Sequence, residues 1–264
     1  MSNLSIYREY GEELERRLRL KTFPISLKLL AKEADIPKEA KRPLKDFGHH
    51  YALCQSFQLT RRDGATIAVL KEDHWCFEPV VGYGLVEPPE FFLEGHNRYP
   101  RDVETLEAGR HYAEEFPQLD VGKYIGTVSA PLKTTSFEPD MVMIYCDSTQ
   151  LSLLLLAREY RDGRNLKCAL SGHAACVYGV VPSIQSDQCQ VAVPCRGDRY
   201  FAMAGDEEMI FTVPKGRLEE LMIGFREIEK TGSKLPKGYR FLPEYPMSLN
   251  YDKIAKLMGF IKEE

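Results

Sequence analysis

The hydrophobic positions of the chain follow two different periods, which predicts both helices and strands. Leu4, Tyr7 and Leu14 recur at near-helical spacing among Glu and Arg residues, so residues 4–20 are expected to form an amphipathic helix. After Pro24, the run from Ile25 to Leu30 has the short apolar pattern of a strand. The chain therefore opens as a helix followed by a strand.

The same two periods continue along the chain without a break. Further strands are predicted at residues 65–70, 121–132, 139–145, 165–170, 189–194 and 209–213. Further helices are predicted at residues 50–61, 102–116, 218–230 and 249–262, with an apolar helical stretch around Gln150 and a loop at 196–199. No low-complexity segment or linker divides residues 1–264. We expect a single α+β domain with a mixed sheet.

Two segments, about residues 24–86 and 139–195, carry similar features in the same order. Each has a strand after a Pro, a helix, an Arg-Asp-Gly turn, a second strand, and then a His and a Cys: His74 with Cys76, and His173 with Cys176. A true duplication would bring the two cysteines to equivalent places near a pseudo-twofold axis. A chance match is the alternative, because helix, Asp-Gly turn and strand often follow one another in proteins of mixed class.

Composition and charge narrow the functional classes. The 264 residues include 35 Lys and Arg against 39 Asp and Glu, a net charge of −4, which gives no general reason to bind nucleic acid. The first 20 residues have no apolar stretch typical of an export signal, and residues 151–157 are far shorter than the roughly 20 that span a bilayer. With seven cysteines, an odd number, we expect a protein of the reducing cytoplasm, without a disulfide framework or membrane contact.

Several enzyme motifs are missing from the sequence. The string Gly82-Tyr83-Gly84 lacks the third glycine of a dinucleotide-binding motif, and no phosphate-binding Walker loop occurs. The string from Leu170 to His173 does not match a serine nucleophile elbow. Nucleotide use and serine hydrolase chemistry are therefore unsupported.

The cysteines are the strongest remaining candidates for chemistry, although none forms a Cys-x-x-Cys pair. Four lie in a helix or at the ends of predicted elements, where ligands are often presented: Cys54, Cys76, Cys176 and Cys195. The other three fit strands or a polar surface and are set aside: Cys146, Cys168 and Cys189. If the four share a centre, soft thiolate ligands favour an iron–sulfur cluster over zinc. The competing interpretation is that all seven are structural.

Other candidates are single residues beside these cysteines. His74 and His173 are expected more often as surface or capping residues than as metal ligands. Arg196 and Arg199 could bind a carboxylate or phosphate through two guanidinium groups, although a solvated turn is the simpler interpretation.

Several separated motifs resemble one protein family. They are Glu138 to Tyr145 before a helix with Gln150, Cys54-Gln55, Cys76, Cys176, and the string from Pro194 to Arg199. Together they resemble the bacterial and archaeal family called domain of unknown function 169, over about residues 24–225. The resemblance implies a cytoplasmic prokaryotic protein, supplies no reaction, and draws attention to the four cysteines in its motifs. The usual pattern of that family has an asparagine where Cys146-Asp147 stands in this chain, which argues against a functional role for Cys146.

Three functional hypotheses follow. The first is a cytoplasmic protein that binds an iron–sulfur cluster, or another thiolate-bound metal, through Cys54, Cys76, Cys176 and Cys195. It would transfer electrons to a redox partner protein or activate a small anionic substrate. The second is a metal-free protein that binds a small anion through Arg196 and Arg199. The third is a thiol redox enzyme with Cys76 or Cys176 as nucleophile.

Overall fold

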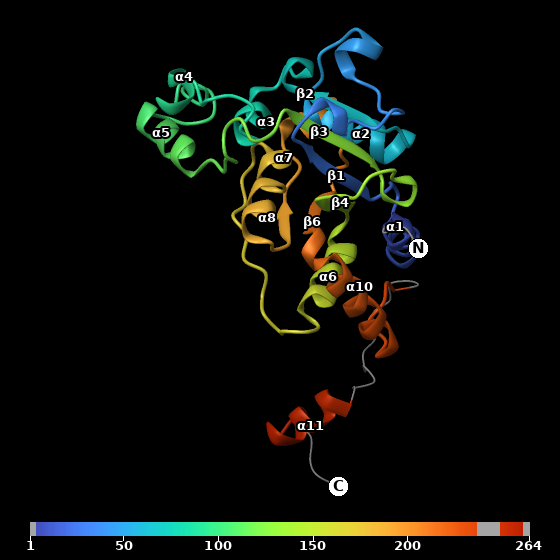
Figure 1. Cartoon of the computed structure of the whole chain (residues 1–264). Coiled ribbons are helices and arrows are strands. Elements are labelled where there is room, and N and C mark those ends of the chain that lie inside the picture. Colours follow the sequence, from blue (N-terminus) through green and yellow to red (C-terminus); the bar gives the residue numbers. More distant parts are fainter. Residues whose placement is uncertain (1–3, 237–248, 261–264) are drawn as a thin grey trace.

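The structure, a computed structural model, describes residues 4–236 and 249–260 of the chain. Its centre is a six-stranded sheet with the strand order β2-β3-β1-β4-β6-β5 (Figure 1). The strands are β1 (Ile25–Leu30), β2 (Ile67–Leu70), β3 (Gly126–Pro131), β4 (Met141–Cys146), β5 (Gln190–Ala192) and β6 (Met209–Pro214). All paired strands in these ranges are antiparallel, and parallel pairing among the described residues is limited to two isolated bridges. The expected α+β class is confirmed, but the sheet is antiparallel rather than mixed.

Helices cover both faces of this sheet. The longer ones are α1 (Leu4–Leu18), α2 (Leu53–Asp63), α5 (Leu106–Glu115), α6 (Ser148–Glu159) and α10 (Lys215–Lys230), while α11 (Leu249–Leu257) lies apart from the sheet (Figure 1). The shorter ones are α3 (Phe77–Gly82), α4 (Glu90–Leu93), α7 (Ala175–Tyr178), α8 (Val181–Ser186) and α9 (Arg196–Phe201). The last predicted helix thus ends at Leu257, while residues 261 and 262 lie outside the described part. No helix in the described ranges has the length and apolar character needed to cross a membrane.

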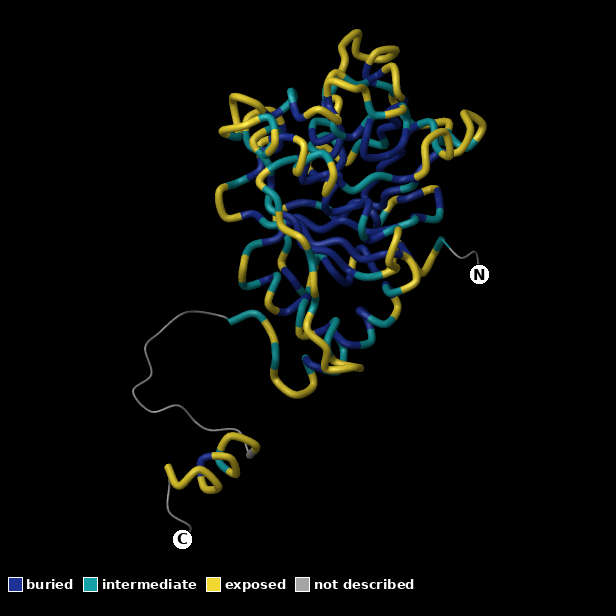
Figure 2. Tube along the Cα trace, turned by 90° about the vertical axis from the view of Figure 1, so that its left-hand side faces the viewer, coloured by how far each residue is buried: buried dark blue, intermediate teal, exposed yellow. Residues whose placement is uncertain are grey.

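Strand β4 separates two hydrophobic cores because successive side chains of a strand point to opposite faces. We call the two sides face A, with Met141, Met143 and Tyr145, and face B, with Val142, Ile144 and Cys146. Helices α2, α3 and α7 contribute to the core on face A, and α1, α6 and α10 to the core on face B. Figure 2 shows the buried residues concentrated along the strands between the two layers.

This arrangement contradicts the proposed correspondence between residues 24–86 and 139–195, although the strand order itself is symmetric about the β1–β4 pair. The two helices that should correspond, α2 and α6, pack on opposite faces of the sheet. The strand expected at residues 165–170 is absent: Leu166 and Cys168 pack against the face B core, but their segment pairs with no strand. The alternating pattern there reflects one-sided packing. The Asp-Gly turns do end both helical stretches, and Gly64 and Gly163 have φ angles of 75° and 64°.

The tightest contact between helices on face B lies where α10 crosses α6. A side-chain carbon added at Gly224 would overlap the backbone carbonyl of Ala157. Gly224→Ala should therefore lower the free energy of unfolding by about 1–3 kcal/mol, measured by urea denaturation, because the two helices must separate. Gly216→Ala in the same helix is the control. Its added carbon would meet only the flexible carboxylate of Asp187, so the change should stay below about 1 kcal/mol in either direction.

Candidate functional site

Four of the seven cysteines lie at the beginnings of four helices on face A. Cys54 is the second residue of α2, and Cys176 is the second residue of α7. Cys76 and Cys195 come directly before α3 and α9. Backbone N–H groups in the first turn of a helix have no partner within the helix, so they are available as donors to sulfur. Each of the four cysteines thus lies at a first helical turn.

The structure brings these four cysteines together. Every pair among Cys54, Cys76, Cys176 and Cys195 is close enough for the charge of one thiolate to raise the pKa of another. A carbon placed at the Cβ position of Gly197 would lie 3.6 Å from the Cys195 sulfur and 3.8 Å from the Cys54 sulfur. The absence of a side chain at Gly197 therefore leaves room beside two of the sulfurs.

The other cysteines lie elsewhere. Cys146 and Cys189 are buried in the face B core, and Cys168 packs against that core. The sheet therefore separates them from the four on face A. Within residues 4–236 and 249–260, no three side chains of His, Cys, Asp or Glu are already arranged to hold a metal ion. The four thiols are gathered, but they do not adopt a coordination geometry.

Burial sets the protonation state of these thiols. It raises the pKa of Cys76 to about 12, with the Glu78 carboxylate adding to the effect, and that of Cys195 to about 11, with Asp198 adding to it. The pKa values of Cys54 and Cys176 are also raised, again mainly by burial. All four are protonated at neutral pH. Because the thiolate is the nucleophile, this argues against the third hypothesis, a thiol redox enzyme.

Backbone hydrogen bonds act in the opposite direction. The N–H groups of Ala175 and Asp198 bond to Cys195, and that of Glu78 bonds to Cys76, which lowers the pKa of each thiol. A donor of this kind favours the charged form of sulfur. The site thus combines a dry environment with fixed donors that would stabilise a thiolate once a cation replaces its proton.

Asp198 connects the cysteines to the sheet. Its side chain is 1% exposed; one oxygen accepts a hydrogen bond from the Tyr145 hydroxyl at 2.8 Å, and the other lies 3.2 Å from the Cys195 sulfur. Burial raises the pKa of Asp198. The guanidinium group of Arg61 lies 4.1 Å from the centre of the Tyr145 ring and pairs with Glu208 at 2.8 Å. A buried polar chain therefore continues beneath the cysteines.

The second hypothesis requires Arg196 and Arg199 to act together, and the structure places them differently from expectation. They lie in the first turns of α9 rather than in a loop, because Asp198 caps that helix at the Cys195 N–H. Arg199 donates to the carbonyl of Gly205 at 2.7 Å, whereas Arg196 stacks over the Tyr200 ring at 5.2 Å. No contact among the described residues brings both guanidinium groups to one point.

The histidines are separate from the cysteines. Burial lowers the pKa of His74 to about 4, and its closest charged neighbours are Asp73 and Glu72. His173 packs its ring against Tyr112, with centroids 5.8 Å apart. Neither ring forms a hydrogen bond with one of the four cysteines in the described part of the chain.

Sequence reasoning missed one group beside Cys76. The carboxylate of Glu78 lies 3.7 Å from the Cys76 sulfur and pairs with Arg98, which is 2% exposed. Arg98 also donates to the Tyr112 hydroxyl at 2.7 Å. The only sequence signal for this group was the spacing Cys76-x-Glu78. Arg98 and Tyr112 come from the later segment that carries α4 and α5, so their place beside Glu78 could not be predicted from local sequence.

Exposed aromatic rings lie next to the cysteines. Trp75 is 50% exposed and Phe201 is 52% exposed, and their rings meet edge to face at 5.2 Å. The Trp75 indole donates to Gln55 at 3.0 Å, which ties the segment of Cys76 to the helix of Cys54. Large exposed apolar side chains of this kind often mark a contact surface.

Comparison with known proteins gives a family but no activity. A family model described as DUF169, uncharacterised ArCR, matches residues 13–224. An uncharacterized protein of Methanocaldococcus jannaschii is 22% identical over 218 residues, which cover 81% of this chain and 91% of that protein. No solved structure matches the chain.

The contact between Asp198 and Cys195 gives a test of the site's electrostatics. Asp198→Asn should lower the pKa of Cys195, because it removes a negative charge that disfavours the thiolate. The reaction of Cys195 with iodoacetamide near pH 9 should then accelerate by up to about ten-fold, which corresponds to one pKa unit. Peptide mapping by mass spectrometry follows each cysteine separately.

Glu78→Gln is the matched control, because it makes the same change beside Cys76. It should accelerate labelling of Cys76 and leave Cys195 unchanged. An unchanged rate at Cys195 in folded Asp198→Asn protein would mean that burial alone controls this thiol.

Proposed function

The chain belongs to the DUF169 family, which is described only as uncharacterised ArCR, so we propose its function from its own residues. We propose that an iron–sulfur cluster serving in electron transfer is bound by Cys54, Cys76, Cys176 and Cys195. The observation that carries the proposal is the meeting of four cysteines from four separate segments on one face of the sheet. Cysteines that act only as small core residues have no reason to meet.

The chemistry of the donor set fits this class of cofactor. Cysteine thiolates are the usual ligands of iron–sulfur clusters, and the potentials of these clusters depend on burial and on hydrogen bonds to sulfur. Here Cys54 and Cys176 are buried, and backbone N–H groups already bond to Cys76 and Cys195. Binding requires each thiol to lose its proton and to turn about its single side-chain torsion toward a common centre.

Electron transfer is favoured over activation of a small substrate. Four cysteine ligands leave no open position, whereas metals that activate substrates keep one. Cys76 and Cys195 are only partly buried and lie beside Trp75 and Phe201, so one side of the site is close to the protein surface. A redox partner protein could approach there. We place the protein in a reducing cytoplasm, where its seven free cysteines would stay reduced.

Anaerobic purification tests the proposal. The protein, reconstituted with iron and sulfide, should be brown with a broad absorbance near about 400 nm, and should contain both iron and acid-labile sulfide. Serine at any one of the four cysteines should reduce the iron content strongly. Cys189→Ser and Cys146→Ser are the matched controls on face B and should retain it.

Three outcomes would contradict the proposal. The first is wild-type protein that binds neither iron nor sulfide, and the second is an equal loss of iron in Cys189→Ser. The third is stable zinc binding without sulfide, which would leave a thiolate centre but remove electron transfer. Iron-free protein that binds a carboxylate, and loses it in Arg196→Gln with Arg199→Gln, would favour the metal-free alternative.

A further inference from the structure

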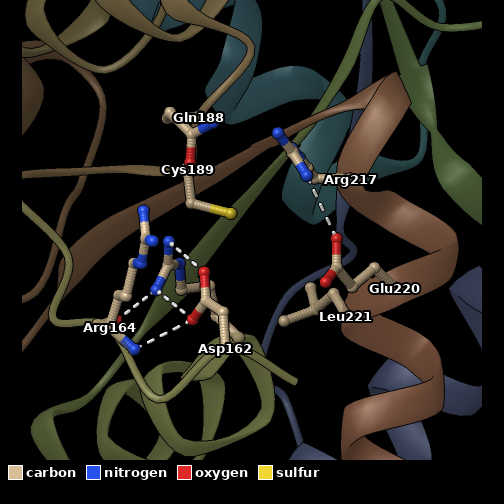
Figure 3. Close-up of a pocket in the computed structure, with 8 residues that line it drawn as sticks. Asp162, Arg164, Gln188, Cys189, Arg217, Glu220 and Leu221 are labelled. Atoms are coloured by element: carbon tan, nitrogen blue, oxygen red, sulfur yellow. Dashed lines mark hydrogen bonds and ion pairs between the residues drawn. The ribbon is translucent and has the colours of Figure 1, made fainter. Parts of the chain in front are cut away.

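A polar cavity of about 250 Å³ lies on face B, away from the four cysteines. Its walls come from the end of α6 and the following turn, from Gln188 and Cys189 just before β5, and from α10. Figure 3 shows the Cys189 sulfur directed into the space between Asp162 and Arg164 on one side and Arg217 on the other. No residue of the proposed cluster site lines this cavity.

Guanidinium groups from two separate segments line the cavity. Arg158, whose side chain is 14% exposed, is held by Asp162 at 3.2 Å and by the carbonyl of Arg164. Arg217, from α10, is held by Glu220 at 3.3 Å. The side chain of Arg164 forms no hydrogen bond or ion pair with any residue in the described ranges. Arg158 and Arg217 are therefore held in place by ion pairs, and Arg164 is available to bind a ligand in the same space.

The positive character extends beyond the cavity. An adjoining hollow of about 490 Å³ shares Arg158, Arg164 and Gln188 with it and adds Asn165, Leu166 and Lys167. The nearby acids are Asp162, Glu220 and, beside Arg217, Asp187. Four cations of the two hollows thus face three carboxylates, on a protein whose net charge is −4. A local excess of positive charge on an acidic protein favours an anionic ligand.

We propose that this cavity binds the oxyanion group of a small molecule, either a phosphate ester or a dicarboxylate. Guanidinium groups bind both types of oxyanion through paired N–H donors. The cavity is slightly smaller than the roughly 300 Å³ at which pockets for larger ligands begin, so it accommodates an anionic group rather than a nucleotide. The adjoining hollow takes the remainder of the molecule, against Asn165 and Lys167.

Calorimetric titration at low salt tests this site with two probes, inorganic phosphate and malonate. At least one probe should bind saturably to the full chain at one site. Arg217→Gln should weaken that binding at least ten-fold, as should Arg158→Gln. Arg217 is 42% exposed, so its replacement should leave the fold intact, and thermal unfolding checks this point for both variants.

Arg161→Gln is the matched control, because Arg161 is on the same surface, 63% exposed and 3.9 Å from Glu220, but does not line the cavity. It should change the affinity by less than two-fold. Absence of saturable binding of both probes, or an equal loss in Arg161→Gln, would overturn the proposal. Preference for phosphate or for malonate distinguishes the two ligand sources. Cysteine variants on face A should leave the binding unchanged, so this result is independent of the cluster.

Discussion

The hydrogen bond between the Tyr145 hydroxyl and the Asp198 carboxylate connects the central sheet to the cysteine site. Tyr145 is on face A only because β4 alternates its side chains, and a shift of one residue would turn it to face B. Asp198 in turn caps α9 through the Cys195 N–H and contacts the Cys195 sulfur. The position of one ligand candidate therefore depends on the register of a strand some fifty residues earlier in the chain.

The helices that carry the cysteines depend on the same packing. Three of them, α3, α7 and α9, have six residues or fewer, which is too short for a helix to be stable alone in water. Helices α3 and α7 form because their apolar residues, such as Val81 and Val177, are buried against face A, whereas α9 is held by its one buried residue, Asp198. The close approach of α3 to α7 shows the same dependence, since a side chain at Gly82 would overlap Val177. The cysteines meet because the core assembles these segments.

Local patterns in the sequence were sufficient for most elements but not for their arrangement. The strand from Ile25 to Leu30 was predicted with the bounds that the structure has, because its apolar run and flanking Pro are local signals. The pairing of β1 with β3 and β4, and the placement of α6 on face B, depend on contacts distant in sequence. The four cysteines could be selected from the sequence because each lies in a predicted helix or at the end of a predicted element. Arg98 and Arg158 could not, because only the folded structure brings Glu78 to Arg98 and assembles the cavity that Arg158 lines.

The surroundings of the four cysteines would pull the reduction potential of a bound cluster in two directions. Backbone N–H donors to sulfur stabilise added negative charge and would raise the potential. The buried carboxylate of Asp198, 3.2 Å from the Cys195 sulfur, repels that charge and would lower it when ionised. Tyr145 donates to the other oxygen of this carboxylate at 2.8 Å and so holds it beside Cys195.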